Sequence, residues 1–133
     1  MNGVVIDAGA ALHLLAAPAP PEPAGELHAP RLIRSEVLSV LHAQVWRGVV
    51  PPEAARAMLE RLEAATVRFF DDDNALHRRA WSIATALGWH KTYNAEYVAL
   101  AQILDLPLLT VDGRLARAVK HLVRIASPTD IGA

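Results

Sequence analysis

The 133-residue sequence contains no cysteine. This absence excludes disulfide bonds, thiolate zinc sites, cysteine-bound iron–sulfur clusters and cysteine nucleophiles. Carboxylates and histidines are the reactive side chains that remain, and the six histidines include no pair at the helical i, i+4 spacing of a metal site. Because a chain without disulfides is compatible with a reducing compartment, we expect the protein in the cytoplasm.

Long apolar runs are also missing. No stretch approaches the roughly 20 apolar residues that a membrane-spanning helix needs. The N-terminal MNGVVIDAGAALHLL has no basic segment before its apolar residues and reaches an aspartate at position 7, so we expect no signal peptide and no membrane partner. Hydrophobic residues make up 53% of the chain, which is ample for one core, and we expect a single domain over residues 1–133.

The chain carries little net charge. The formal value is -1 at pH 7, so the field of the whole molecule does not attract nucleic acid, and any RNA contact must come from a local patch. Arginine is much commoner than lysine. A guanidinium group suits bidentate phosphate contacts, although a GC-rich genome explains the same bias.

Short β-branched runs alternate with helical patterns along the chain. We expect strands at residues 4–6, 66–70, 106–111 and 122–125, and helices at residues 8–16, 31–46, 54–65, 74–87, 94–104 and 113–119. The proline-rich segment 18–25 is expected to form a loop, and Gly48 and Gly88 to end helices. This alternation predicts an α/β fold in which a central, mostly parallel sheet carries helices on both faces.

Two of the expected strands end in a lone aspartate, Asp7 after VVI and Asp112 after LLTV. Parallel strands can bring such carboxylates to the same edge of a sheet, where open α/β sheets bind their ligands. Clustered carboxylates repel one another unless a cation neutralises them, and hard oxygen ligands select magnesium or manganese. Such a site can act on a phosphodiester.

Each candidate residue also has a purely structural interpretation. Asp7 precedes a helix and is a good N-cap, as is Asn94 before AEYVALA. Glu36 falls on the flank of an amphipathic helix and could be a solvated charge. Asp112 precedes Gly113, and Asp-Gly is a strong turn signal. Spacing alone therefore gives an acidic site only modest support.

The ordered segments VVIDAGA, RSEVLSVL and YNAEYVALAQILDLPLLTVDGRL resemble the PIN-domain pattern of the VapC toxins of bacterial toxin–antitoxin systems. The resemblance extends from near the N-terminus to about Leu115. It implies a PIN-like three-layer sandwich and a magnesium- or manganese-dependent endoribonuclease. The residues implied as metal-binding and catalytic are Asp7, Glu36, Asn94 and Asp112, and the Thr110 hydroxyl is expected to support them.

The same resemblance implies protein partners as well as an RNA substrate. A cognate antitoxin is expected to fill the cleft, and a homodimer is expected to form through the helices at 31–46 and 54–65. The basic residues best placed to meet RNA are Arg34, Lys91, Arg114 and Arg117, each of which could equally be an ordinary surface charge.

Asn94 departs from the family pattern, which usually has aspartate there. The substitution removes a negative charge but keeps an oxygen ligand, which binds a hard cation more weakly than a carboxylate does. Glu96 lies two residues on and could restore the charge. We favour the interpretation that it simply complements the helix dipole in the first helical turn.

Two other functions compete with the nuclease. The first is a PIN-fold module that binds an antitoxin but has weak or no turnover because of Asn94. The second is a phosphatase-like enzyme with Asp7 as the nucleophile. That enzyme would need a second aspartate two residues further on, where this chain has Gly9.

Overall fold

The structure is a computed structural model that describes residues 3–16 and 25–126. In these residues five strands form one sheet in the order β3-β2-β1-β4-β5, and every neighbouring pair is parallel. The strands are β1 (Gly3–Ile6), β2 (Glu26–Ala29), β3 (Val67–Phe69), β4 (Leu108–Leu109) and β5 (Ile125–Ala126).

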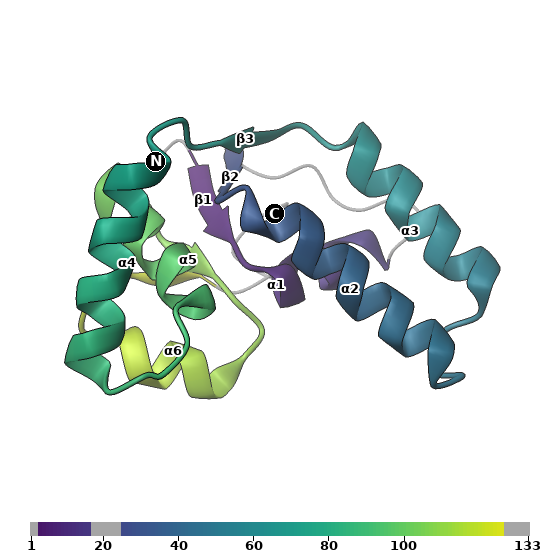
Figure 1. Cartoon of the computed structure of the whole chain (residues 1–133). Coiled ribbons are helices and arrows are strands. Elements are labelled where there is room, and N and C mark those ends of the chain that lie inside the picture. The colour runs from purple at the N-terminus through teal and green to yellow at the C-terminus, as the bar shows by residue number, and fades with distance from the viewer. Residues whose placement is uncertain (1–2, 17–24, 127–133) are drawn as a thin grey trace.

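Helices cover both faces of this sheet. In the described residues they are α1 (Ala8–Leu15), α2 (Leu32–Trp46), α3 (Pro52–Ala64), α4 (Asp73–Leu87), α5 (Tyr93–Leu104) and α6 (Gly113–Val119). The first three helices pack against one another, whereas α5 packs on β1 and β4 and is covered by α4 (Figure 1). The predicted α/β architecture is confirmed. None of the described helices combines the length and the apolar character needed to span a bilayer.

The central strand β1 is buried along its whole length. A parallel strand with both faces covered needs apolar residues throughout, which explains the run GVVI. At Gly3 an added Cβ would lie 2.7 Å from the Glu26 carbonyl oxygen, so the pairing with β2 leaves no room for a side chain there. On its other side β1 pairs with β4, in a register that sets Ile6 beside Leu109. These two neighbouring strands lead directly to the two aspartates.

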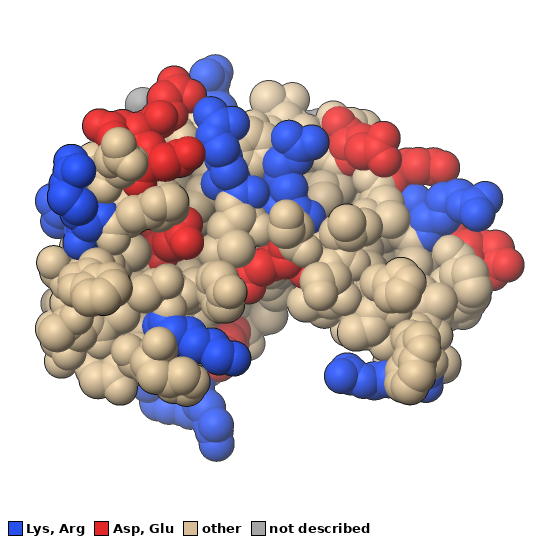
Figure 2. Space-filling view, viewed as in Figure 1, with Lys and Arg blue, Asp and Glu red and all other residues tan. Residues whose placement is uncertain are grey.

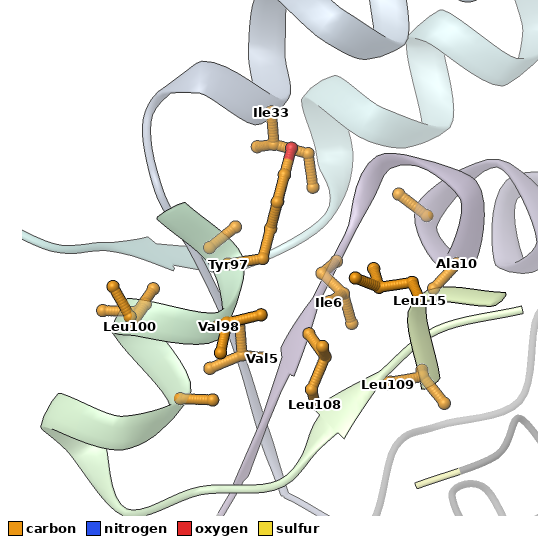
Figure 3. Packing of buried hydrophobic residues seen from close by; sticks show 14 of the residues in the cluster. Val5, Ile6, Ala10, Ile33, Tyr97, Val98, Leu100, Leu108, Leu109 and Leu115 are labelled. Atoms are coloured by element: carbon orange, nitrogen blue, oxygen red, sulfur yellow. The ribbon is translucent and has the colours of Figure 1, made fainter. Parts of the chain in front are cut away.

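The hydrophobic core is centred on β1, β4 and α5. Val98 of α5 lies close to Val5, while Leu115 of α6 lies between Ile6 and Ala10 (Figure 3). Six of the twelve residues of α5 are buried, and all are apolar except for one tyrosine hydroxyl. This helix is therefore part of the core rather than a surface layer.

Several expected boundaries differ from the structure. Strand β2 was not predicted, because its residues ELHA are short, polar and mostly half-exposed. Its polar side chains are instead paired, as in the 2.9 Å ion pair between Glu26 and Arg68 of β3. Strand β4 covers only Leu108–Leu109 of the expected 106–111, and β5 begins at Ile125 rather than residue 122. Residues 18–24 of the expected proline-rich loop lie outside the described residues.

The predicted helix ends were more accurate. Gly48 follows α2 with a φ of 77°, and Gly88 caps α4 with a φ of 71°, a left-handed conformation that glycine adopts without strain. The start of α5 was wrong: its N-cap is Thr92, and Asn94 is the second residue inside the helix.

Arg61, in the last turn of α3, links this helix to the C-terminal end of α1. Its guanidinium donates a hydrogen bond to the carbonyl of Leu15, the last residue of α1. A cation on an unsatisfied carbonyl at a helix C-terminus satisfies the backbone and complements the dipole.

We expect Arg61→Ala to lower the free energy of unfolding by about 1–2 kcal/mol, measured by urea denaturation. Arg56→Ala, at an exposed position of the same helix, is the matched control and should change it by less than about 0.5 kcal/mol. Equal effects would contradict the capping role.

Candidate functional site

Asp7 and Asp112 lie at the same edge of the sheet. Asp7 directly follows β1, Asp112 follows β4 after Val111, and the two strands are parallel neighbours. Both residues are also N-caps. Asp7 Oδ1 accepts from the Ala10 amide at 2.8 Å, and Asp112 Oδ1 accepts from the Arg114 amide at 2.9 Å. Because capping uses Oδ1 in both cases, it is compatible with a second role for Oδ2.

Burial sets the electrostatics of Asp7. The side chain is only 6% exposed, and this desolvation raises the pKa of its carboxyl group. Hydrogen bonds from Thr110 and from the Ala10 amide act in the opposite direction, whereas the nearby charge of Asp112 raises the pKa further. Asp7 is therefore held at an electrostatic cost that a cation would relieve.

Thr110 links the two aspartates. It is buried, its hydroxyl lowers the pKa of Asp7, and its Oγ1 accepts from the Asp112 amide at 3.1 Å. Support of a metal site by this hydroxyl stays a prediction.

Glu36 of α2 contacts Tyr97 of α5. It is half-buried, and its Oε1 accepts a short hydrogen bond from the hydroxyl of Tyr97 on α5, 61 residues further along the chain. The pKa of Tyr97 lies far above its usual value because the ring is buried and because its hydroxyl donates a hydrogen bond to Glu36. The charges of Asp7 and Glu96 raise it further. Glu36 is thus not an unattached surface charge.

Asn94 and Glu96 occupy other helical positions than expected. With Thr92 as the N-cap, they are the second and fourth residues of α5. Asn94 is exposed. The Glu96 side chain is only 14% exposed, and its Oε1 lies 3.6 Å from Nε2 of His77 on α4. Burial raises the pKa of Glu96, His77 lowers it, and the charges of Asp73 and Glu36 raise it again. No histidine had been assigned to the site from the sequence.

The donor chemistry of this edge fits a hard divalent cation. Within residues 3–16 and 25–126, no basic side chain forms an ion pair with Asp7, Glu36 or Asp112. Oxygen donors without a protein counter-charge suit magnesium or manganese. In the same described ranges no three His, Asp or Glu side chains are already close enough to hold one ion, so binding requires side-chain rotation or bridging water.

One face of the molecule is hollowed. Figure 2 shows acidic atoms near the middle of a concave surface, with Lys and Arg atoms around it. Of the basic residues expected to meet RNA, Lys91, Arg114 and Arg117 are exposed, and the Arg34 guanidinium lies 5.9 Å from the centre of the Phe69 ring. Arg34 also lines a groove of about 820 Å³ between α2, α3 and β3. The positive charges are local, as the small net charge requires.

Comparison with known proteins identifies the family. No family model matches the sequence. Ribonuclease VapC12 of Mycobacterium tuberculosis is 30% identical over 128 residues, which cover 92% of this chain and 96% of the relative. Ribonuclease VapC9 of the same organism is 33% identical over 116 residues, covering 85% and 88%. The chain belongs to the VapC ribonuclease family. Ribonuclease VapC1 is 36% identical over 91 residues, covering 68% of this chain and 66% of that VapC.

The fold agrees with the VapC assignment. The crystal structure of PAE2754 from Pyrobaculum aerophilum superposes with a TM-score of 0.69 and covers 96% of this chain and 92% of that one. At 20% identity this likeness concerns the fold alone. The chain is therefore a VapC-like PIN-domain protein, and the assignment of metal-binding roles to Asp7, Glu36, Asn94 and Asp112 stays a prediction.

Proposed function

We propose that the protein is a cytoplasmic endoribonuclease toxin that uses magnesium or manganese to cleave RNA phosphodiester bonds and is inhibited by a cognate antitoxin. The observation that carries this proposal is that Asp7 and Asp112 follow neighbouring parallel strands, with the buried Thr110 bonded to the Asp112 amide and lowering the pKa of Asp7. Glu36 of α2 accepts a hydrogen bond from the Tyr97 hydroxyl on α5, which supports its proposed place beside these carboxylates. Relatives named ribonuclease VapC support the reaction class.

Asp7, Glu36 and Asp112, with the amide oxygen of Asn94, would hold the metal ion. Bound there, the ion would supply Lewis-acid stabilisation of the charge that develops on the phosphodiester and would activate a water molecule. The protein itself keeps the carboxylates in place: Asp7 and Asp112 through their helix caps, and Glu36 through Tyr97. The exposed Lys91, Arg114 and Arg117 would contact RNA phosphates.

The outer surface of α2 is the proposed place for protein partners. Leu38 is 54% exposed and Trp46 is 83% exposed, and with His42 between them they line a surface cavity of about 620 Å³. Large exposed apolar side chains are typical of interaction surfaces. The expected homodimer would cover this face, and the antitoxin would reach the acidic cleft.

The purified chain should cleave a mixed-sequence single-stranded RNA pool when manganese or magnesium is present, and EDTA should stop the reaction. We expect Asp112→Asn to lower the rate by more than about 100-fold, beyond the range typical of residues that only support a metal site. Asp105→Asn is the matched control. That aspartate is 92% exposed at the other end of α5, where it pairs with Arg124, and the variant should keep full activity.

Cleavage that continued in EDTA would refute metal dependence. Equal rates for wild type and Asp112→Asn would remove Asp112 from the site. Both rates are measured with an RNA strand that carries a fluorophore at one end and a quencher at the other, because cleavage separates the two and raises the fluorescence.

A further inference from the structure

We infer that Tyr97 is a positioning residue of the metal site: its hydroxyl holds the carboxylate of Glu36 beside the carboxylates at the sheet edge. The inference rests on the proposed function, because it concerns how the proposed ligand set is kept in place. It assigns a role to the hydroxyl of a buried side chain of α5.

The environment of Tyr97 makes its hydroxyl conspicuous. The residue is 1% exposed, and its buried neighbours on α5 are Ala95, Val98 and Ala99. The ring runs from α5 toward Ile33 near the start of α2, with its oxygen at the far end (Figure 3). A buried phenol costs stability unless its hydroxyl finds a partner. Here the partner is Glu36, a charged residue from a different helix.

Glu36 needs such a support. A glutamate side chain has several rotatable bonds, and fixing it costs up to about 2 kcal/mol of rotamer entropy. It is only half-buried, so packing alone does not define its direction. The bond from Tyr97 engages Oε1, and Oε2 can therefore still bind a cation.

A tyrosine is suited to this task because it donates without bringing charge. An arginine or lysine would orient Glu36 equally well, but its positive charge would compete with the cation. Burial and the surrounding carboxylates raise the pKa of Tyr97, so the phenol keeps its proton at physiological pH and stays a donor. Its shape can be conserved by phenylalanine, which makes the role of the hydroxyl measurable.

The test is a double-mutant cycle on the full chain. Manganese affinity is measured by isothermal titration for wild type, Tyr97→Phe, Glu36→Gln and the double variant, and each metal-free protein is also unfolded in urea. We expect Tyr97→Phe to weaken manganese binding about tenfold, as is typical when a supporting partner of a metal ligand is removed. In the Glu36→Gln background the same change should have no further effect. Tyr93→Phe is the matched control, since Tyr93 lies one helical turn earlier, is 54% exposed and should leave the affinity unchanged.

The outcomes distinguish the positioning role of Tyr97 from the proposed metal site itself. If wild type binds manganese and Tyr97→Phe binds it equally well, the inference is wrong and the proposed function stands. A loss of equal size in the Glu36→Gln background would also overturn it, because Tyr97 would then act on something other than Glu36. A Tyr97→Phe protein that no longer folds would make the hydroxyl a folding determinant and end the positioning role. Absence of manganese binding by wild type would instead refute the metal site itself, and the inference with it.

Discussion

Asp7→Asn should abolish RNA cleavage and at the same time make the metal-free protein more stable. The loss of cleavage follows from removing a buried carboxylate that we propose binds the metal, and we expect it to exceed about 100-fold. The gain in stability follows from the burial of Asp7, which raises the pKa of its carboxyl group above the ordinary value of 3.8. Asparagine keeps an oxygen for the cap bond to the Ala10 amide and removes the desolvated charge.

The raised pKa of Asp7 determines how the stability of the protein changes with pH. The raised pKa means that the folded state binds the Asp7 proton more tightly than the unfolded state does. The stability that this proton contributes is therefore fully present below pH 3.8 and is lost as the pH rises through the folded-state pKa. At neutral pH the ionised group therefore destabilises the fold. We expect Asp7→Asn to raise the free energy of unfolding by about 0.5–2 kcal/mol at neutral pH, a usual size for such replacements at functional sites, and the advantage should shrink on acidification.

With manganese present, wild type should instead be more stable than Asp7→Asn. A ligand that binds only the folded state stabilises it by about 2.7 kcal/mol at a concentration 100 times its dissociation constant. Wild type gains this stability, whereas Asp7→Asn does not. The measurement is urea denaturation with manganese and with EDTA. Asp112→Asn is the control: Asp112 is exposed, so its replacement should remove activity without the gain in stability. A destabilised metal-free Asp7→Asn protein would contradict the argument.

Much of the fold was readable because its signals are local. The β-branched run before Asp7 predicts a buried strand, and the strand must end where the aspartate caps the next helix. Glycine marked the helix end at position 88 because its φ of 71° suits that residue. Strand β2 carried no such signal, since its polar residues are accommodated only by pairing with β3.

The site was less readable because its contacts are not local. The bond between Tyr97 and Glu36 joins residues 61 positions apart, and no spacing rule predicts it. Asn94 is a better N-cap type than most residues, yet the N-cap is Thr92, which makes no side-chain cap bond, and α5 begins at Tyr93. That shift moves Glu96 to the fourth helical position, where its side chain meets His77 of α4.

Asn94→Asp should tighten manganese binding and raise the cleavage rate. A carboxylate adds Coulomb attraction that the neutral amide lacks, and we expect about tenfold in the dissociation constant, or ~1.4 kcal/mol, by isothermal titration. If only the substituted protein cleaved RNA, the native chain would be a PIN-fold antitoxin-binding module rather than a competent nuclease. Equal affinities would mean that position 94 does not contact the metal or that Glu96 already supplies the missing charge.

Glu96→Gln distinguishes these last two explanations. Successive helical residues diverge by about 100°, so residues 94 and 96 point to nearly opposite sides of α5. Glu96 lies against His77, 3.6 Å away, although it is close enough to Glu36 for the two charges to interact. We therefore expect Glu96→Gln to change manganese affinity by no more than about threefold, roughly 0.65 kcal/mol. A much larger loss would show that this chain has moved its third carboxylate by two positions, to a side chain that contacts α4.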